Sequence, residues 1–342
     1  MSVDPIKFDD GKLFVLDQLL LPHQSNMIVV DSCLGVFNII RKMNVRGAPL
    51  IGFTGIFGLS FAAREVNSFD HLAEKAQHLV SARPTAVNLS FEINDCLKHL
   101  RETFSYYESE SVHLFCVEFA RRKIKKLESD NTRAAKCLME DLLRKLPGKS
   151  KYNILTICNT GKLACGTRGT ALGAISLLNE NDLINRVYAC ETRPYLQGSR
   201  LTAYELKSEG IDYSIIPDGA VAHTLKTQKV DAIFVGADRV ALNGDTANKI
   251  GTANISIIAN YYEIPFYVVA TISSFDFECQ NGDSIDIELR DDDELTMFDG
   301  KHISPKGSGT FNPGFDITES KFITAIVCEK GVFSPTLVKD LY

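Results

Sequence analysis

After Lys151, short β-rich runs alternate with stretches of helical periodicity, and this alternation constrains the fold more than any other feature. The β-rich runs cover residues 153–158, 186–190, 212–217, 231–236 and 265–270, with a last one at 322–330. The helix-like stretches between them cover 169–179, 199–210, 220–227 and 251–262. Strands and helices that alternate at this spacing form βαβ units with right-handed crossovers. The sequence therefore predicts an α/β fold with a mostly parallel sheet.

The chain before Lys151 has a different pattern. After an early strand-like run at 14–22, apolar residues recur at three- and four-residue spacing in segments 33–43, 49–64, 69–80, 88–104 and 111–146. The stretch 145–151 holds Pro147 and Gly148 and interrupts this periodicity, so we expect a linker there. We therefore expect a small helical N-terminal domain with short N-terminal strands (residues 1–146) and a Rossmann-like C-terminal domain (residues 151–342).

Composition excludes several broad classes of protein. Hydrophobic residues make up 45% of the 342 residues and charged residues 23%, which is typical of a folded protein. The 37 basic and 43 acidic residues give a net charge of −6, which argues against a general nucleic-acid or membrane-surface binder. The longest apolar runs are shorter than the roughly 18–20 residues of a membrane span. We therefore expect no nucleic-acid partner and no membrane association.

Cysteine usage and the N-terminal residues indicate the compartment. The nine cysteines are scattered without a CxxC pair, so they fit neither a disulfide framework nor a zinc finger. The first residues, MSVDPIKFDDGK, include acids and lack the apolar stretch of a signal peptide. We expect reduced thiols in a cytoplasmic protein, and a eukaryotic cell could hold part of it in the nucleus.

Motifs for common cofactors are missing from the sequence. The glycine-rich stretch 161–173 matches neither the dinucleotide-binding fingerprint nor the P-loop, and no HExxH-type metal spacing occurs. We therefore expect no metal and no nucleotide cofactor.

Polar and small residues follow the predicted strands where these end. Cys158 ends the run 153–158, Gln197 follows 186–190, and Asp238 follows 231–236. Because ligands of open parallel sheets bind beyond the carboxyl ends of the strands, we expect these residues to converge on one edge.

Cys158 allows two interpretations. Free cysteines are among the most buried residues, so it can be a core thiol. The polar turn Asn159-Thr160-Gly161 follows it, so its thiol can instead face a pocket. No base stands next to it in the sequence, so a Cys/His pair is not indicated.

Asp238 also allows two interpretations. It can pair with Arg239 or cap the next turn, and an ion pair would lower its pKa. Alternatively, it is a carboxyl at the mouth of an apolar strand, where desolvation raises its pKa and lets it carry a proton near neutral pH. The two interpretations predict opposite pKa shifts.

Three cationic positions are candidates for binding an anion. Arg46 and Gly47 precede a helix that Pro49 can begin, and a helix start offers free N–H groups and a positive dipole end. The alternative is a tightly packed helix start in which Gly47 permits close approach. Lys249 precedes a second predicted helix, and Arg83 is the third candidate.

Several motifs taken together are distinctive. They are NVRGAPLIG (44–52), SARPTAVNL (81–89), TICNTGKLA (156–164), ETRPYLQGSRLTAYEL (191–206), VGADRVALNGDTANKIGT (235–252) and FNPGFDIT (311–318). They resemble the methylthioribose-1-phosphate isomerases over nearly the whole chain. That family shares a superfamily with the regulatory subunits of the translation-initiation guanine-nucleotide exchange factor and with ribose-1,5-bisphosphate isomerase.

The resemblance implies roles for nine residues. The family's catalytic cysteine and aspartate correspond to Cys158 and Asp238. Its phosphosugar contacts correspond to Arg46, Gly47, Ala48, Arg83, Gln197, Asn248 and Lys249. The fold that it implies, a small helical domain and a Rossmann-like domain, agrees with the periodicity.

The resemblance also implies an activity. The reaction is the conversion of S-methyl-5-thio-ribose 1-phosphate to S-methyl-5-thio-ribulose 1-phosphate in methionine salvage, by a homodimer. Two alternatives stay open at this point. The sugar can be 5-deoxyribose 1-phosphate or ribose 1,5-bisphosphate, or the chain can be a non-catalytic regulatory subunit.

Overall fold

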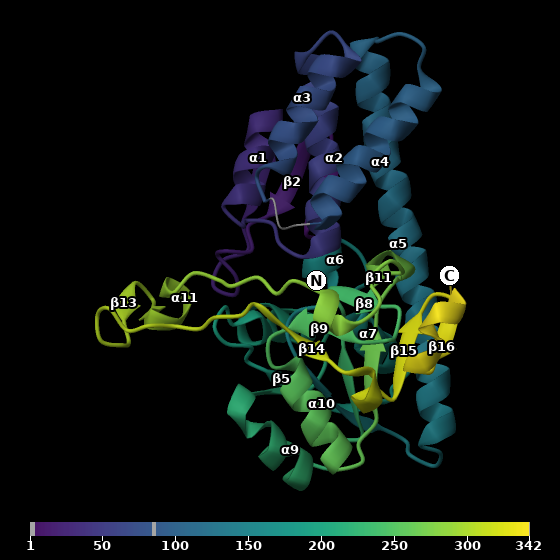
Figure 1. The fold of residues 1–342 in the computed structure, drawn as a ribbon, viewed down its shortest axis with the longest axis vertical. Coiled ribbons are helices and arrows are strands. Elements are labelled where there is room, and N and C mark those ends of the chain that lie inside the picture. Colours follow the sequence, from purple (N-terminus) through teal and green to yellow (C-terminus); the bar gives the residue numbers. More distant parts are fainter. Residues whose placement is uncertain (1–3, 84–86, 342) are drawn as a thin grey trace. The chain divides into compact units, whose positions relative to one another are not determined.

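The structure is a computed structural model that describes residues 4–83 and 87–341 (Figure 1). Within the described residues the chain forms two compact units. The first combines Met1–Ser129 with Gly161–Gly169, and the second combines Asp130–Thr160 with Thr170–Tyr342. The domain boundary expected between residues 146 and 151 stays a prediction about which parts of the chain fold independently.

The first unit packs helices against a small antiparallel sheet. The strands are β1 (Ile6–Asp9), β2 (Lys12–Leu16) and β3 (Met27–Val30), in the order β1-β2-β3. The helices are α1 (Cys33–Arg41), α2 (Ala48–Glu65), α3 (Phe69–Val80), α4 (Val87–Thr103), α5 (Ser109–Lys145) and the short α6 (Lys162–Cys165). Figure 1 shows α1–α4 side by side. Helix α2 is buried along nearly its whole length because it packs against α1, α3 and α4.

The second unit is built on a seven-stranded sheet. Its strands are β4 (Tyr152–Thr156), β5 (Ile184–Cys190), β6 (Tyr213–Ile216), β7 (Ala232–Val235), β10 (Phe266–Val269), β15 (Ala325–Cys328) and β16 (Gly331–Phe333). The order is β16-β15-β10-β7-β4-β5-β6, and every pair is parallel except β15 with β16. The prediction of an α/β fold with a mostly parallel sheet is confirmed.

Helices cover both faces of this sheet. One core joins the sheet to α5, to α7 (Ala171–Glu180) and to α8 (Ala203–Ser208). The other core joins it to α9 (Val221–Thr227) and α10 (Thr252–Tyr261). Neighbouring residues of β4 face opposite cores, with Ile154 in the first and Leu155 in the second, as strand geometry requires. This explains why the central strands are continuous apolar runs.

A second, four-stranded sheet was not predicted from the sequence. It consists of β11 (Phe275–Asp276), β8 (Arg239–Ala241), β9 (Thr246–Lys249) and β14 (Phe315–Thr318), in that order. Strands β8 and β9 form a hairpin whose turn contains Asn243 and Gly244. An Asn-Gly pair between two short strands is a strong hairpin signal, so the turn was visible in the sequence. The pairing of β9 with β14 was not.

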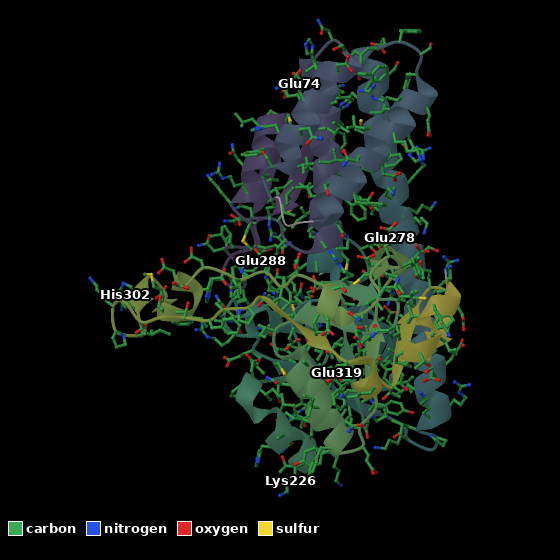
Figure 2. The ribbon with its side chains drawn as sticks, in the orientation of Figure 1. Glu74, Lys226, Glu278, Glu288, His302 and Glu319 are labelled. Carbon is green, nitrogen blue, oxygen red and sulfur yellow. The ribbon has the colours of Figure 1, made fainter. Side chains whose placement is uncertain are left out.

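The acidic stretch at residues 284–300 leaves the body of its own unit, as Figure 1 shows for α11 (Asp293–Thr296). It also carries a two-stranded hairpin of β12 (Met297–Phe298) and β13 (Lys301–His302). Figure 2 shows Glu288 toward the base of this excursion and His302 at its far end. Within the described ranges, every helix falls short of what a membrane span needs in length and hydrophobicity.

Candidate functional site

The strand order of the second unit reverses between β4 and β7. Successive strands are added on one side of β4 as β5 and β6, and on the other side as β7, β10 and β15. At such a switch point the loops that leave two neighbouring strands turn in opposite directions, and ligands bind at the carboxyl ends between them. Cys158 follows β4 and Asp238 follows β7, so these two predicted residues flank the switch point.

Cys158 has an unusual backbone conformation. Its φ is +65°, in the left-handed region that residues with a side chain rarely adopt. Its N–H donates to Thr192 Oγ1 at 2.9 Å, and its carbonyl accepts from Thr202 Oγ1 at 2.5 Å. Thr192 and Leu196 also have positive φ values, +64° and +60°. Strained residues of this kind persist only where the surrounding structure holds them, and they cluster at functional sites.

The side chain of Cys158 is half-buried. Of the nine cysteines, all of which are free thiols, only Cys137 and Cys158 are not buried. Cys158 therefore packs against one core of the sheet but keeps part of its side chain exposed. Burial removes the Cys190 thiol from water and raises its pKa.

Gln197 lies on the loop after β5 and is buried. It immediately precedes a π-helical turn, η1 (Gly198–Thr202), which runs directly into α8. A Cβ on Gly198 would lie only 1.7 Å from the carbonyl oxygen of Cys190, so glycine is required for this turn to approach the end of β5. Single π-helical turns are rare and are frequently found at functional sites.

Asp238 stands at the start of the β8–β9 hairpin. Its N–H donates to the Ala247 carbonyl at 2.9 Å, which ties it to the strand that ends in Asn248 and Lys249. Just before it, Gly236 packs against Thr160 of the loop after β4, with 2.7 Å between a built Cβ and Thr160 Cγ2. The loops that carry Cys158 and Asp238 are therefore in direct contact.

The two interpretations of Asp238 are separated by its surroundings. Arg239 forms its ion pair with Asp276, at 3.4 Å. Within the described chain, Asp238 makes no ion pair and no side-chain hydrogen bond. Asp238 keeps part of its surface exposed to solvent. The surrounding protein nevertheless limits the hydration of its carboxyl group, and this desolvation raises the pKa of Asp238 above the usual 3.8. The nearby Lys249 ammonium acts in the opposite direction. The upward direction is the one expected of a proton-carrying carboxyl.

Asn248 and Lys249 end β9 and are fixed by β14 and α10. The Asn248 amide is buried and donates to Thr252 Oγ1 at 3.1 Å. The Lys249 ammonium donates to the Gly314 carbonyl at 2.8 Å and lies 4.0 Å from the centre of the Phe315 ring. These contacts hold a cation at this position before any anion arrives.

Asp316 caps α10 and was not singled out from the sequence. Its carboxylate accepts from the N–H groups of Gly251 and Ala253, at 2.7 and 3.1 Å. The start of α10, which follows Lys249, therefore already binds a carboxylate. The N–H groups of Gly251 and Ala253 are not open to an anionic ligand, contrary to the expectation from the sequence. Burial raises the pKa of Asp316 to about 6, against the two N–H groups and Lys249, which lower it.

In the first unit, Arg46, Gly47 and Ala48 form the start of α2. Gly47 has φ +90° and precedes the helix, with Pro49 in its first turn, as the sequence predicts. The close approach that Gly47 permits is to another segment of the chain: a Cβ would lie 2.2 Å from the Ala164 carbonyl oxygen of α6. Gln18 Nε2 donates to the Leu163 carbonyl at 2.8 Å, so it fixes α6 beside this start. Gln18 was not found from the sequence.

Arg83 also belongs to the first unit and follows the end of α3. The next three residues of its motif, Pro84, Thr85 and Ala86, lie outside the described residues. The second unit thus holds five of the nine predicted residues. Cys158, Gln197 and Asp238 follow β4, β5 and β7, and Asn248 and Lys249 end β9. The other four belong to the first unit. In the described part of the chain, no three His, Cys, Asp or Glu side chains are arranged to hold a metal ion.

Comparison with known proteins gives a family and full-length relatives. The Initiation factor 2 subunit family (IF-2B) matches residues 44–335. A Methylthioribose-1-phosphate isomerase of Nematostella vectensis is 41% identical over 353 residues, covering 99% of this chain and 98% of its own length. A 5-deoxyribose 1-phosphate isomerase of Clostridium botulinum is 42% identical over 344 residues, covering 98% of this chain and 97% of its own.

Two solved structures are similar over almost all of the chain. One is 5-methylthioribose 1-phosphate isomerase from Pyrococcus horikoshii, with a TM-score of 0.90 and 32% identity, covering 99% of this chain and 95% of that one. The other is described as translation initiation factor eIF-2B, subunit delta, from A. fulgidus, with a TM-score of 0.86 and 35% identity. It covers 98% of this chain and 97% of its own.

Proposed function

This chain belongs to the Initiation factor 2 subunit family and is a sugar-phosphate isomerase, and we propose that its substrate is S-methyl-5-thio-ribose 1-phosphate. The product would be S-methyl-5-thio-ribulose 1-phosphate, in methionine salvage. One observation carries the assignment of the chemistry to residues: Cys158 and Asp238 leave β4 and β7 at the switch point of the sheet, on loops that touch each other.

The reaction sets a specific chemical problem. Phosphate on C1 locks the sugar as a cyclic acetal, so no free aldehyde forms before isomerisation. The ring opens when its oxygen takes a proton and its bond to C1 breaks, which leaves positive charge at C1. The hydrogen on C2 then passes to C1, as a hydride or as a proton through an enediol. The C2 hydroxyl loses its proton and becomes the carbonyl, so atoms and electrons balance.

We assign the ring-opening proton to Asp238. A carboxyl can donate it near neutral pH only if its pKa is raised, and desolvation raises the pKa of Asp238. Cys158 acts at the C2 centre or its hydroxyl. Neither step calls for a metal or a nucleotide cofactor.

We assign the phosphosugar contacts to the seven residues that the family resemblance implies. Lys249 and Asn248, with Gln197, would supply a cation and amide groups in the second unit. Arg46, Gly47 and Ala48 would supply a guanidinium and the open start of α2, and Arg83 a further cation. Cationic groups of this kind form charge-assisted hydrogen bonds with phosphate oxygens.

The second candidate substrate is 5-deoxyribose 1-phosphate, because the relative of that name is as similar as the methylthioribose one. The two sugars differ only in the group at C5, and the same proton transfers serve both. Ribose 1,5-bisphosphate remains a third member of the same chemical series.

Turnover of these three sugar phosphates by the purified enzyme tests the proposal. We expect the highest kcat/KM with S-methyl-5-thio-ribose 1-phosphate. A preference for 5-deoxyribose 1-phosphate would move the assignment to the second candidate, and no turnover of any of the three would overturn the chemistry as well.

Asp238→Asn tests the acid role separately. The variant keeps the size of the side chain but cannot donate the same proton, so we expect kcat to fall at least about 10²-fold. Substrate affinity should change little or tighten, since a negative charge beside the phosphosugar is removed. Full activity would contradict the role. Lost binding with kcat preserved would assign Asp238 to structure instead.

Two further expectations stay proposals. The homodimer implied by the family resemblance would give twice the mass of one chain in light scattering. The cytoplasmic location, inferred from the composition and the scattered thiols, can be tested by microscopy of a tagged chain in its own cell.

A further inference from the structure

The two backbone groups of Cys158 are both held by threonine hydroxyls. Cys158 N–H donates to Thr192 Oγ1, which comes from the end of β5. Thr202 Oγ1, from the last residue of the π-helical turn, donates to the Cys158 carbonyl. Both threonines are buried. Because peptide groups on both sides of the residue are tied, its φ and ψ are fixed together.

Each hydroxyl is itself oriented by a second contact. Thr192 Oγ1 donates to the Cys190 carbonyl at 3.0 Å, so its lone pair is left to accept from Cys158. Thr202 Oγ1 donates to Cys158 and accepts from the Asn159 amide at 3.3 Å. The same amide donates to the buried Glu205 at 2.7 Å. A hydroxyl with one donor and one acceptor contact has no free rotation, so these are defined hydrogen bonds.

The loop end of β6 supports Thr192 in turn. The Asp218 carboxylate accepts from the N–H groups of Thr192 and Arg193, at 2.8 and 2.6 Å. Thr192 has φ +64°, a value that a β-branched residue adopts only under constraint, and these bonds supply the constraint. Residues that follow three neighbouring strands, β4, β5 and β6, therefore together fix the conformation of Cys158.

We propose that Thr192 and Thr202 are positioning residues that hold Cys158 in its left-handed conformation and so set where its thiol lies for the reaction. This rests on the proposed role of Cys158. Left-handed backbone costs a residue with a side chain about 1–3 kcal/mol, so without these bonds the segment would relax toward ordinary φ. The thiol would move with it. A displacement near 1 Å at a reacting group can cost about 10²-fold in rate.

Thr202→Val is the main test, because valine keeps the shape and removes the hydroxyl. We expect kcat to fall about tenfold or more and KM to stay within about twofold, because Thr202 is not among the phosphosugar contacts. Thr202→Ser restores the hydroxyl and should recover kcat to within about threefold. Thr202→Ala removes the same hydroxyl with a different steric change, so it answers the question if the valine variant does not fold.

Thr324→Val is the matched control. The Thr324 hydroxyl also ties the backbone of a neighbouring strand, by accepting from Phe266 N–H at 2.9 Å. It stands at the amino ends of β10 and β15, the edge of the sheet opposite the switch point. This variant should keep kcat while it loses a comparable hydrogen bond.

A second readout separates positioning from catalysis. Iodoacetamide alkylation of Cys158 can be followed peptide by peptide in wild type and variants, with half-buried Cys137 as the internal reference. We expect the Cys158 rate, relative to Cys137, to change severalfold in Thr202→Val and not in Thr324→Val. Unchanged alkylation and unchanged kcat in Thr202→Val would overturn the positioning role.

The proposed function can fail independently of this inference. If Cys158→Ser kept full activity, the catalytic role of Cys158 would fall, while the alkylation rates would still report whether the threonines fix its conformation. A loss of kcat in Thr202→Val that serine did not recover would assign the effect to packing and would also overturn the proposal.

Discussion

The starts of α2 and α10 look alike in sequence and differ in structure. Each helix follows a glycine at positive φ, +90° for Gly47 before α2 and +100° for Gly251 before α10. A cationic side chain stands close to each glycine: Arg46 directly precedes Gly47, and Lys249 lies two residues before Gly251. At α10, the Asp316 carboxylate accepts from the first N–H groups. At α2, within the described residues, no side chain accepts from the N–H groups of Ala48 and Leu50.

This difference separates two ways of offering positive charge. A helix start with open N–H groups can bind an anion through its backbone and dipole. A start that already holds a carboxylate offers only the side chains in front of it. We therefore expect backbone contacts with the phosphosugar at α2, and contacts through Asn248 and Lys249 alone at α10.

Gly47→Ala and Gly251→Ala should give the largest difference between the two starts. At Gly47 a Cβ would meet the backbone of Ala164 at 2.2–2.6 Å, and backbone cannot move aside cheaply. At Gly251 it would meet only the end of the Ile157 side chain, at 3.2 Å. We expect about 2–5 kcal/mol of destabilisation for the first and about 1–2 kcal/mol for the second, measured by urea unfolding.

Equal destabilisation by the two alanines would show that positive φ, which they share, dominates the cost. It would also show that the contact between the α2 start and α6 is loose. Gly148→Ala is a useful control, since Gly148 has φ +82° and nothing within 4 Å of a built Cβ. It reports the cost of the backbone conformation alone.

Periodicity and strand ends could be predicted from the sequence, whereas pairings between distant segments could not. The expected helix 33–43 is α1, and the expected strand 231–236 contains β7, because each pattern depends only on neighbouring residues. Asp316 was not predicted as a cap because it lies 65 residues from the helix start that it holds. The β9–β14 pairing that brings it there has no local signal.

The same reason explains what was predicted at the candidate site. Cys158 and Asp238 were placed at strand ends by their own neighbours in sequence. The conformation of Cys158 and the surroundings of Asp238 depend on other segments. Thr192 and Thr202 bind the backbone of Cys158, and Arg239 forms its ion pair with Asp276 rather than with Asp238. A polar residue at a strand end can be found from sequence, but its pKa and its conformation depend on residues that the fold brings to it.

Arg46→Ala and Lys249→Ala should both weaken substrate binding but differ in pH dependence. Each variant loses a charge-assisted contact, worth about 1.5–3 kcal/mol, so we expect KM to rise about 10- to 100-fold. Lys249 also lowers the pKa of Asp238. Without it, the Asp238 carboxyl should stay protonated to higher pH, and the alkaline fall of kcat/KM should move to higher pH.

Profiles of kcat/KM against pH for wild type and the two variants measure this. Arg46→Ala serves as the control, because it should raise KM without moving the alkaline limb. The same shift in both variants would mean that the limb does not report Asp238. An unchanged KM in both would show that the assigned phosphosugar contacts are wrong.

Asp316→Asn should give the smallest effect, and it tests the capped start directly. The pKa of Asp316 is raised from 3.8 to about 6 in the folded protein, so the folded state binds its proton more tightly than the unfolded state. This contribution to stability is complete below pH 3.8 and is lost as the pH rises through 6. Asparagine does not titrate. Between pH 5 and 7.5, wild type should therefore lose about 1.4 kcal/mol relative to the variant.

The measurement is urea unfolding of both proteins at the two pH values, because the difference between them cancels every other titrating group. An offset that is the same at both pH values would mean that the pKa of Asp316 is not raised, because the N–H groups of α10 and Lys249 offset its burial or outweigh it. A third unfolding series at pH 3 separates these two cases, since a pKa held below 3.8 costs the wild type stability only as the pH falls through that value. A loss of wild-type stability relative to the variant at pH 3 would show that the N–H groups and Lys249 outweigh burial.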